Sequence, residues 1–183
     1  MDIRVRKSKE SIKNAFIELR TKKELRKITV KELCLKANIN KSTFYEHYED
    51  IFDLSDQIES YVVKQIIDSI KHKHNMLLNV PKVTSELFYA MKSQEDLINI
   101  VFSGTEHPNL VYKISTMLKD IIFESNPKLK NNSKFNILLD YVIFGGYYAF
   151  EENSKIDDNP SEIINTLTHV ITHMNKLFTE NNS

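Results

Sequence analysis

The chain has 183 residues, of which 41% are hydrophobic and 27% are charged, and 25 lysines and arginines balance 25 acidic residues to a formal net charge of zero. This balance argues against a uniformly basic polyanion binder, such as a histone-like or ribosomal protein, although a local basic surface can still exist. Three glycines and four prolines are too few for folds rich in tight turns, and they form no glycine-rich phosphate loop.

The charge is concentrated at the N-terminal end of the chain. Residues 1–45 hold thirteen lysines and arginines against five acidic residues, a net charge of +8, so residues 46–183 carry −8. A basic head on an acidic body favours a head that binds a polyanion, although lysines also occur on ordinary solvated helix surfaces.

We expect a cytoplasmic protein without a membrane span. The first four residues lack an apolar signal core, and no stretch of about 18 uninterrupted apolar residues occurs. The single cysteine, Cys34, cannot form an internal disulfide, which fits a reducing compartment. Its helical context indicates a small buried apolar residue.

The first predicted helix runs from about Arg6 to Arg20, because four apolar residues recur at the spacing of one helical face: Ile12, Ala15, Phe16 and Leu19. A polar, basic stretch follows. Thr29 and Glu32 then have the spacing of a capping box, in which each side chain bonds to the other residue's amide, and they predict the start of a second helix.

A third helix is predicted from Lys41 to about Tyr48, with Asn40 as its cap, after a break at residues 38–40. Phe44 is expected to point inward. Two short helices separated by about four residues, with the small Ala37 at their close approach, have the dimensions of a helix-turn-helix. The first helix supplies a platform that covers their apolar faces.

The pattern beyond residue 50 is helical throughout, so the sequence predicts an all-α fold. A long helix is expected over about 51–74, followed by helices over 81–92, 94–102, 108–124, 133–151 and 160–179. Prolines at 81, 108 and 160 lie at helix starts, where the missing amide hydrogen is not needed.

The run over residues 29–48, Thr-Val-Lys-Glu-Leu-Cys-Leu-Lys-Ala-Asn-Ile-Asn-Lys-Ser-Thr-Phe-Tyr-Glu-His-Tyr, closely resembles the DNA-binding segment of the TetR/AcrR family of bacterial transcriptional regulators. The resemblance is strong over residues 8–55 and beyond them rests on helical architecture. It implies a three-helix DNA-binding domain over residues 1–50 and a larger helical domain over residues 51–183 that senses a ligand and dimerises. The implied function is a sequence-specific regulator, with repression as the family default.

Two positions depart from the family pattern. Residues 22–25, Lys-Lys-Glu-Leu, stand where many members have a glycine followed by an aromatic residue, so this loop can follow a different path. Ile51 stands where many members have a lysine that touches a phosphate, and nearby lysines would have to replace that contact.

The resemblance assigns DNA contacts to six residues: Thr29, Lys41, Ser42, Thr43, Tyr45 and His47. Lys41 can reach a guanine edge or a phosphate, and the two hydroxyl residues after it can bond to phosphates or bases. Tyr45 and His47 are expected to contact phosphates. Thr29 can offer its hydroxyl and the free amides of its helix to a phosphate, although it would serve as a cap without DNA. Tyr48 is expected to pack beneath the head.

A single head engages only about half an operator, so the resemblance implies a homodimer whose recognition helices lie about one DNA turn apart, roughly 34–36 Å. The last two helices carry more apolar residues than one inner stripe needs, although all of them could be monomer core. A pair of adjacent glycines, each costing about 1 kcal/mol in a helix, suggests a close helix approach. The candidate interface residues are Phe135, Leu139, Val142, Gly145, Gly146, Ile163, Leu167, Val170 and Met174.

An inducible regulator also needs a pocket for a small-molecule effector. Six large side chains of the body are candidates, although such residues more often form ordinary core: Phe88, Met91, Phe102, Tyr112, Met117 and Phe123. A ligand that prefers a conformation with badly spaced heads would lower DNA affinity. The sequence predicts no cofactor.

Two other functions remain open. His169 and His173 share a helix face, as metal ligands can, but no glutamate base lies between them and the zinc-protease motif fails, so we expect no enzyme and no metal site. A TetR-like DNA-binding module that answers to a protein coregulator instead of a ligand is the second alternative. The expected partners are therefore double-stranded operator DNA, a second copy of the chain and a small-molecule effector.

Overall fold

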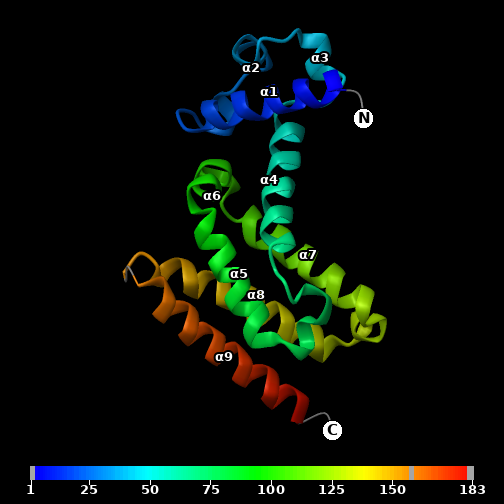
Figure 1. The fold of residues 1–183 in the computed structure, drawn as a ribbon, viewed down its shortest axis with the longest axis vertical. Helices are drawn as coiled ribbons and strands as arrows, with labels where there is room; N and C mark the ends of the chain where they lie inside the picture. Colours follow the sequence, from blue (N-terminus) through cyan, green and yellow to red (C-terminus); the bar gives the residue numbers. More distant parts are fainter. Residues whose placement is uncertain (1–2, 157–158, 181–183) are drawn as a thin grey trace. The chain divides into compact units, whose positions relative to one another are not determined.

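The computed structural model describes residues 3–156 and 159–180, and it confirms the all-α fold, with no strand among these residues. The elements follow the chain in this order: α1 (Ile3–Arg20), η1 (Leu25–Lys27), α2 (Val30–Ala37), α3 (Lys41–Tyr45), α4 (Ile51–Asp68), η2 (Lys73–Leu78), α5 (Val80–Ser93), α6 (Glu95–Val101), η3 (Gly104–Glu106), α7 (Asn109–Ser125), η4 (Pro127–Asn131), α8 (Ser133–Asn153) and α9 (Pro160–Glu180). The η elements are short 3-10 helices. Figure 1 shows their course.

The chain forms two compact units. Unit 1 comprises residues up to Val62 together with Asp96–Pro108, and unit 2 comprises Val63–Glu95 and the residues from Asn109 onward. Unit 1 therefore takes in α6 and η3, which the predicted division at residue 50 leaves in the C-terminal part. The assignment of DNA binding to residues 1–50 and of sensing to residues 51–183 stays a prediction.

Unit 1 is held together by a core in which α1 packs against α2, and α2 against α3 (Figure 1). The large side chains that are fully buried in unit 1 include Ile12, Phe16, Leu33, Phe44, Leu54 and Phe102. Burying such a side chain stabilises a fold by about 1.5–3 kcal/mol relative to leaving it in water. The core orients the short helices although α3, at five residues, is too short to be stable alone.

A buried guanidinium joins α1 to the segment after α6. Arg20, the last residue of α1, donates to the carbonyl oxygens of Lys23, Val101 and Ser103 at 3.1–3.3 Å and to the Ser103 hydroxyl at 2.7 Å. It also pairs with Glu106 at 3.3 Å. A buried charge is tolerated only when it is paired and hydrogen-bonded, so this residue ties Asp96–Pro108 to unit 1.

Unit 2 is built from longer helices, in which α9 packs against both α5 and α8, and α7 packs against α8 (Figure 1). The predicted helices over 81–92, 94–102, 108–124, 133–151 and 160–179 are confirmed to within two residues at each end. Pro160 begins α9, and the Asn132 side chain caps α8 by accepting from the Phe135 amide at 3.0 Å.

The predicted long helix over residues 51–74 is wrong at its C-terminal end, since α4 stops at Asp68. Glu86, from α5, accepts hydrogen bonds from the Lys71 and His72 amides at 2.9 and 3.2 Å, and its other oxygen lies 2.8 Å from the His72 ring. A carboxylate at least fourteen residues further along the chain therefore accepts hydrogen bonds from these amides. Local apolar periodicity gives no signal for such a distant contact.

Candidate nucleic-acid interface

The turn between α2 and α3 is set by Asn38, which has φ 54° and ψ 49°, the left-handed conformation. Among residues other than glycine in the described chain, Asn38 alone has a positive φ. Asparagine adopts this conformation more readily than other side chains do, and here it ends α2. The next amide, that of Ile39, bonds back to the Cys34 carbonyl at 3.0 Å. The predicted break at residues 38–40 is therefore confirmed, and α3 can leave in a new direction.

One of the two predicted capping bonds at the start of α2 is present. The Thr29 hydroxyl accepts from the Glu32 amide at 3.2 Å. The reciprocal bond of a capping box is not found among the described residues, because the Glu32 carboxylate instead pairs with Lys23 at 2.6 Å. Thr29 is exposed at this helix start, so its hydroxyl serves as a cap and also lies at the surface.

The third helix is shorter than predicted, since α3 ends at Tyr45 instead of about Tyr48. Asn40 occupies the cap position, but its side chain makes no capping bond, contrary to the prediction. After Tyr45 the amides of His47 and Tyr48 both bond to the Phe44 carbonyl, at 3.0 Å, so the backbone tightens into a turn.

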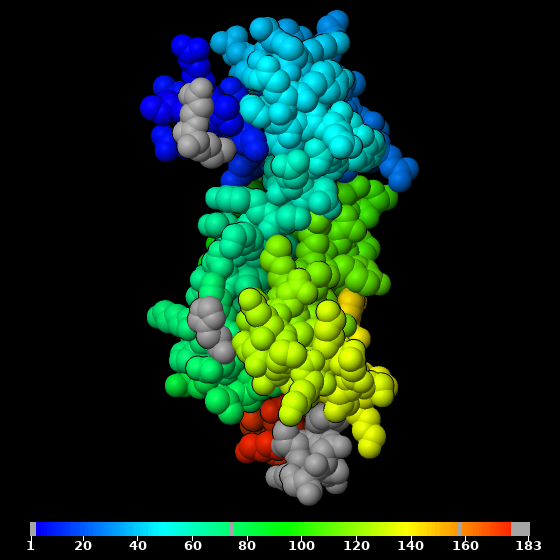
Figure 2. Space-filling model, turned by 90° about the vertical axis from the view of Figure 1, so that its right-hand side faces the viewer, coloured from blue at the N-terminus to red at the C-terminus, as the bar shows by residue number. Residues whose placement is uncertain are grey.

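The side chains of this segment divide into an inner and an outer set. Phe44 and Tyr48 are buried, as predicted, and their rings contact each other at 5.6 Å between centroids. Tyr45 is 57% exposed and meets the Phe44 ring edge-on at 5.4 Å, so one buried ring holds an exposed one in place. The remaining outer residues are exposed or half-buried: Lys41, Ser42, Thr43 and His47. Figure 2 shows this part of unit 1, in light blue to cyan, at the surface.

Much of the basic charge of the head is neutralised locally. Lys22 and Lys36 both pair with Glu18, and Lys27 pairs with Glu24. Lys13 lies 3.6 Å from the centroid of the Tyr61 ring, a cation–π contact. Lys41, by contrast, forms no ion pair with any residue that the structure describes. Its ammonium group is thus available to an anion at the beginning of α3.

The beginning of α4 is closed to an anion. Asp50 accepts from the Phe52 and Asp53 amides at 2.7 and 2.8 Å, and Asp53 accepts from the Glu49 amide at 2.9 Å. The Gln57 side chain, and then the Glu49 amide, hold the pKa of Asp53 below its usual value, so it stays ionised. Carboxylates at this helix start stabilise the helix but repel a phosphate. The Ile51 side chain is buried. The sequence pattern indicates the missing lysine at Ile51 but not this acidic cap.

Cys34 lies close behind the turn and is buried. Burial raises the pKa of its thiol, although the nearby charge of Lys41 acts in the opposite direction. The thiol therefore remains protonated, as expected for an apolar packing residue.

The candidate interface residues of the two last helices fall into different environments. Phe135, Gly146 and Ile163 are buried, Leu139, Val142, Leu167 and Met174 are half-buried, and Gly145 and Val170 are exposed. A methyl group added at Gly146 would lie 3.2 Å from Ile171 Cδ1, so this glycine permits a close approach of α8 to α9 within one chain. A methyl group added at Gly145 would meet nothing within 4 Å.

Unit 2 contains an apolar cavity of about 120 Å³ between η2, α5, α7, α8 and α9. Of the candidate pocket residues, Phe88 and Met91 line it, as do three of the candidate interface residues: Phe135, Leu139 and Val142. Met117 and Phe123 are half-buried on α7 and Tyr112 is exposed, and none of the three lines the cavity. Phe102 lies in the core of unit 1.

The two histidines of α9 are both exposed, with ring centroids 5.3 Å apart. In the part of the chain that the structure describes, no group of three or more histidine, cysteine or acidic side chains could hold a metal ion. Over the same residues, no helix is both long and apolar enough to cross a membrane.

Comparison with known proteins finds no family model that matches the sequence. The chain is similar to the uncharacterized HTH-type transcriptional regulator YxbF of Bacillus subtilis (strain 168), with 25% identity over 113 residues. The aligned residues cover 61% of this chain but 27% of that protein, so the chain spans only about a quarter of the length of the relative. The similarity is therefore to part of a protein that is named as a helix-turn-helix transcriptional regulator.

Proposed function

We propose that the chain is a sequence-specific DNA-binding transcription regulator, a repressor of the TetR/AcrR type. It acts as a homodimer on a near-palindromic operator and is released from the operator by a small-molecule effector. The observation that carries the proposal is the arrangement of α2, the left-handed Asn38 and α3, with a free lysine and an exposed tyrosine on the outer side of α3. We propose no catalytic activity.

On DNA, the N-terminal half of α3 enters the major groove. Lys41 and Ser42 are exposed and Thr43 is half-buried, so these three side chains reach base edges or nearby phosphates. Tyr45 and His47 follow on the same surface and bond to phosphates, which set the position of the helix without reading sequence. The carboxylates at the start of α4 repel phosphates, so this helix start contributes no favourable phosphate contact.

The homodimer uses an exposed apolar stripe of α8. Ile137 and Tyr141 are 70% and 67% exposed, and Gly145 and Tyr148 continue the same face at helical spacing. Large apolar side chains that lie together at the surface mark an interaction site more often than singly exposed ones do. Val170 adds an exposed apolar side chain from α9, which packs against α8.

The effector acts through linkage. A ligand that binds more tightly to the DNA-free conformation lowers operator affinity by the ratio of its two affinities, and DNA lowers the affinity for the ligand by the same factor. The apolar cavity of unit 2 supports a small-molecule effector over a protein coregulator, because a protein partner needs a surface and this space lies among helices.

The test compares two tyrosines of matched exposure, Tyr45 at 57% and Tyr112 at 61%. Tyr45→Ala should abolish binding of the full chain to a duplex selected from a random pool, measured by fluorescence anisotropy, while helix content and dimer mass stay unchanged. Tyr112→Ala, in unit 2, should bind this duplex like the parent chain. Equal affinity of the parent chain and Tyr45→Ala would refute α3 as the reading helix.

A further inference from the structure

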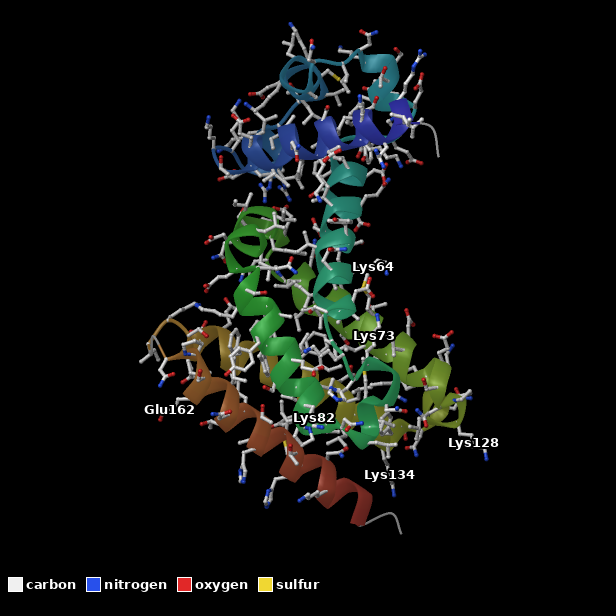
Figure 3. All side chains as sticks on the ribbon, in the orientation of Figure 1. Lys64, Lys73, Lys82, Lys128, Lys134 and Glu162 are labelled. Atoms are coloured by element: carbon white, nitrogen blue, oxygen red, sulfur yellow. The ribbon has the colours of Figure 1, made fainter. Side chains whose placement is uncertain are left out.

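The wall of the cavity in unit 2 is almost entirely apolar. Among the described residues, nineteen line it; none of these is Asp, Glu, Lys, Arg or His, and three of them, Thr84, Tyr147 and Asn175, carry polar oxygen or nitrogen atoms in their side chains. The charged side chains of unit 2 lie elsewhere: Lys128 and Lys134, for example, are exposed and extend away from the helices (Figure 3). The cavity is therefore an apolar space inside a unit with a charged surface.

The lack of charge in the wall determines the charge of a ligand. An ion moved from water into an apolar space without a counter-ion loses far more hydration free energy than van der Waals contacts return. Carboxylates and ammonium ions are thus disfavoured even when their hydrocarbon parts fit. A neutral ligand loses little, and its apolar surface gains about 25 cal/mol per Å² buried.

The size of the cavity limits the ligand further. An engineered apolar cavity of about 150 Å³ in another protein stays dry and binds benzene. At about 120 Å³, the present cavity accepts a compact molecule of similar size. Two methionines in its wall, Met76 and Met91, have flexible side chains that can adjust by small amounts to the shape of the ligand.

One polar group of the wall is free to bind the ligand. Thr84, on α5, is only 8% exposed, and its side chain has no hydrogen-bond partner among the residues that the structure describes. Tyr147 differs, because burial first and Glu151 second raise the pKa of its hydroxyl, which donates to Glu151. A hydroxyl in the cavity wall that has no protein partner is available to a ligand, so Thr84 favours a ligand with one hydrogen-bonding group.

We propose that this cavity binds a neutral, compact, mostly hydrocarbon molecule of about the size of benzene that carries one hydroxyl or carbonyl group, which bonds to Thr84. Its role as an effector rests on the DNA-binding function proposed above, whereas binding itself does not.

The first test uses three probes with one carbon skeleton and different charge: benzyl alcohol, benzoate and benzylammonium. Isothermal titration calorimetry on the full chain at pH 7 should detect benzyl alcohol at one site per chain and at least tenfold weaker binding of both ions. Binding of either ion as tight as that of the alcohol would overturn the proposal, and so would the absence of any binding by benzyl alcohol.

The second test concerns Thr84. Thr84→Val replaces the hydroxyl by a methyl group of similar shape, and toluene is the probe that lacks the ligand hydroxyl. The ratio of the dissociation constants of toluene and benzyl alcohol should fall by about threefold to tenfold in Thr84→Val, the range expected for one hydrogen bond. An unchanged ratio, with the variant folded by circular dichroism, would show that Thr84 does not select the ligand.

A third variant adds a methyl group on α8 against two side chains of the cavity wall. Gly146→Ala places a methyl group 3.2 Å from Ile171 Cδ1 and 3.5 Å from Phe88 Cζ, and both of these side chains line the cavity. Gly145→Ala makes the same change one residue earlier, where nothing lies within 4 Å. Benzyl alcohol should bind several-fold more weakly to Gly146→Ala and unchanged to Gly145→Ala; equal binding to both would place the ligand elsewhere.

Operator binding is measured separately on the same samples. A chain that binds benzyl alcohol but no selected duplex would retain the cavity proposal and refute the regulator. A chain that binds a selected duplex but no benzyl alcohol would retain the regulator and refute this ligand.

Discussion

Units 1 and 2 are both helical but treat polar groups in opposite ways. Unit 1 buries the charge of Arg20 and surrounds it with carbonyl oxygens, a hydroxyl and a carboxylate, while the space around Phe16, Phe44 and Leu54 is filled. Among its described residues, unit 2 buries no charged side chain, leaves the Thr84 hydroxyl without a hydrogen-bond partner and retains a cavity. The DNA-reading surface proposed for unit 1 needs rigid support, whereas the ligand site proposed for unit 2 needs room.

The first comparison is between two buried phenylalanines. Phe44→Ala in unit 1 should cost about 5 kcal/mol of unfolding free energy, and Phe88→Ala in unit 2 about 3, the upper and lower parts of the usual range. Phe44 is enclosed by packed side chains, whereas Phe88 borders an existing space on one side and stacks on Phe150 on the other. Urea unfolding followed by circular dichroism gives both values; a larger loss at Phe88 would reverse the comparison.

The buried charge of unit 1 is tested by Arg20→Met. Removing the guanidinium leaves Glu106 and three carbonyl groups without this donor, so the free energy of unfolding should fall by about 3 kcal/mol. Lys27→Met is the control, because its ion pair with Glu24 is exposed on both sides and should contribute less than about 0.5 kcal/mol. Equal effects of the two substitutions in urea unfolding would mean that Arg20 is not a structural tie.

A smaller loss of unfolding free energy is expected at the helix N-caps, which both units form with a side-chain oxygen. Thr29 caps α2 in unit 1 and Asn132 caps α8 in unit 2, each by accepting an amide hydrogen three residues later. Replacing either residue by alanine should cost about 1 kcal/mol, and Thr29→Ser should restore nearly all of the loss at that position. A failure of serine to restore stability would show that the Thr29 methyl group, not the cap, matters.

The smallest effect is a titration at the surface of unit 2. Hydrogen bonds first from Lys64 and then from Lys73 lower the pKa of Asp68 from 3.8 to about 2. Because the folded pKa is lowered, the stabilisation is present above about pH 4 and is lost as the pH falls towards 2. The Asp68 carboxyl shift in NMR spectra should titrate near 2 in the parent chain and near its ordinary value in Lys64→Gln/Lys73→Gln; identical titrations would contradict this origin.

Local signals predicted most of the fold. Apolar spacing and the prolines at helix starts placed the helices of unit 2 within two residues, and Thr29 and residues 38–40 marked the start and end of α2. The outer position of Tyr45 and the burial of Phe44 followed from one helical period. The six residues proposed to contact DNA lie on or beside α2 and α3, but their contacts stay predictions.

The features missed by sequence reasoning depend on contacts between distant residues. Glu86 accepts from the amides after α4 from fourteen or fifteen residues away, and all acceptors of Arg20 except the Lys23 carbonyl lie more than eighty residues later. The cavity is enclosed by residues of five elements that lie far apart in the sequence. Four of the six predicted pocket residues do not line it. No periodicity within a helix reports such an arrangement.

The proposed function is tested most directly by selecting duplexes from a random DNA pool with the full chain. The account predicts enrichment of a near-palindromic sequence with two half-sites about one helical turn apart, roughly 10–10.5 base pairs centre to centre, or a multiple of it. It also predicts that the enriched duplex loses affinity steeply as salt rises. Failure to enrich any sequence over several rounds, or enrichment of sites without two-fold symmetry, would contradict a dimeric regulator that reads DNA through α3.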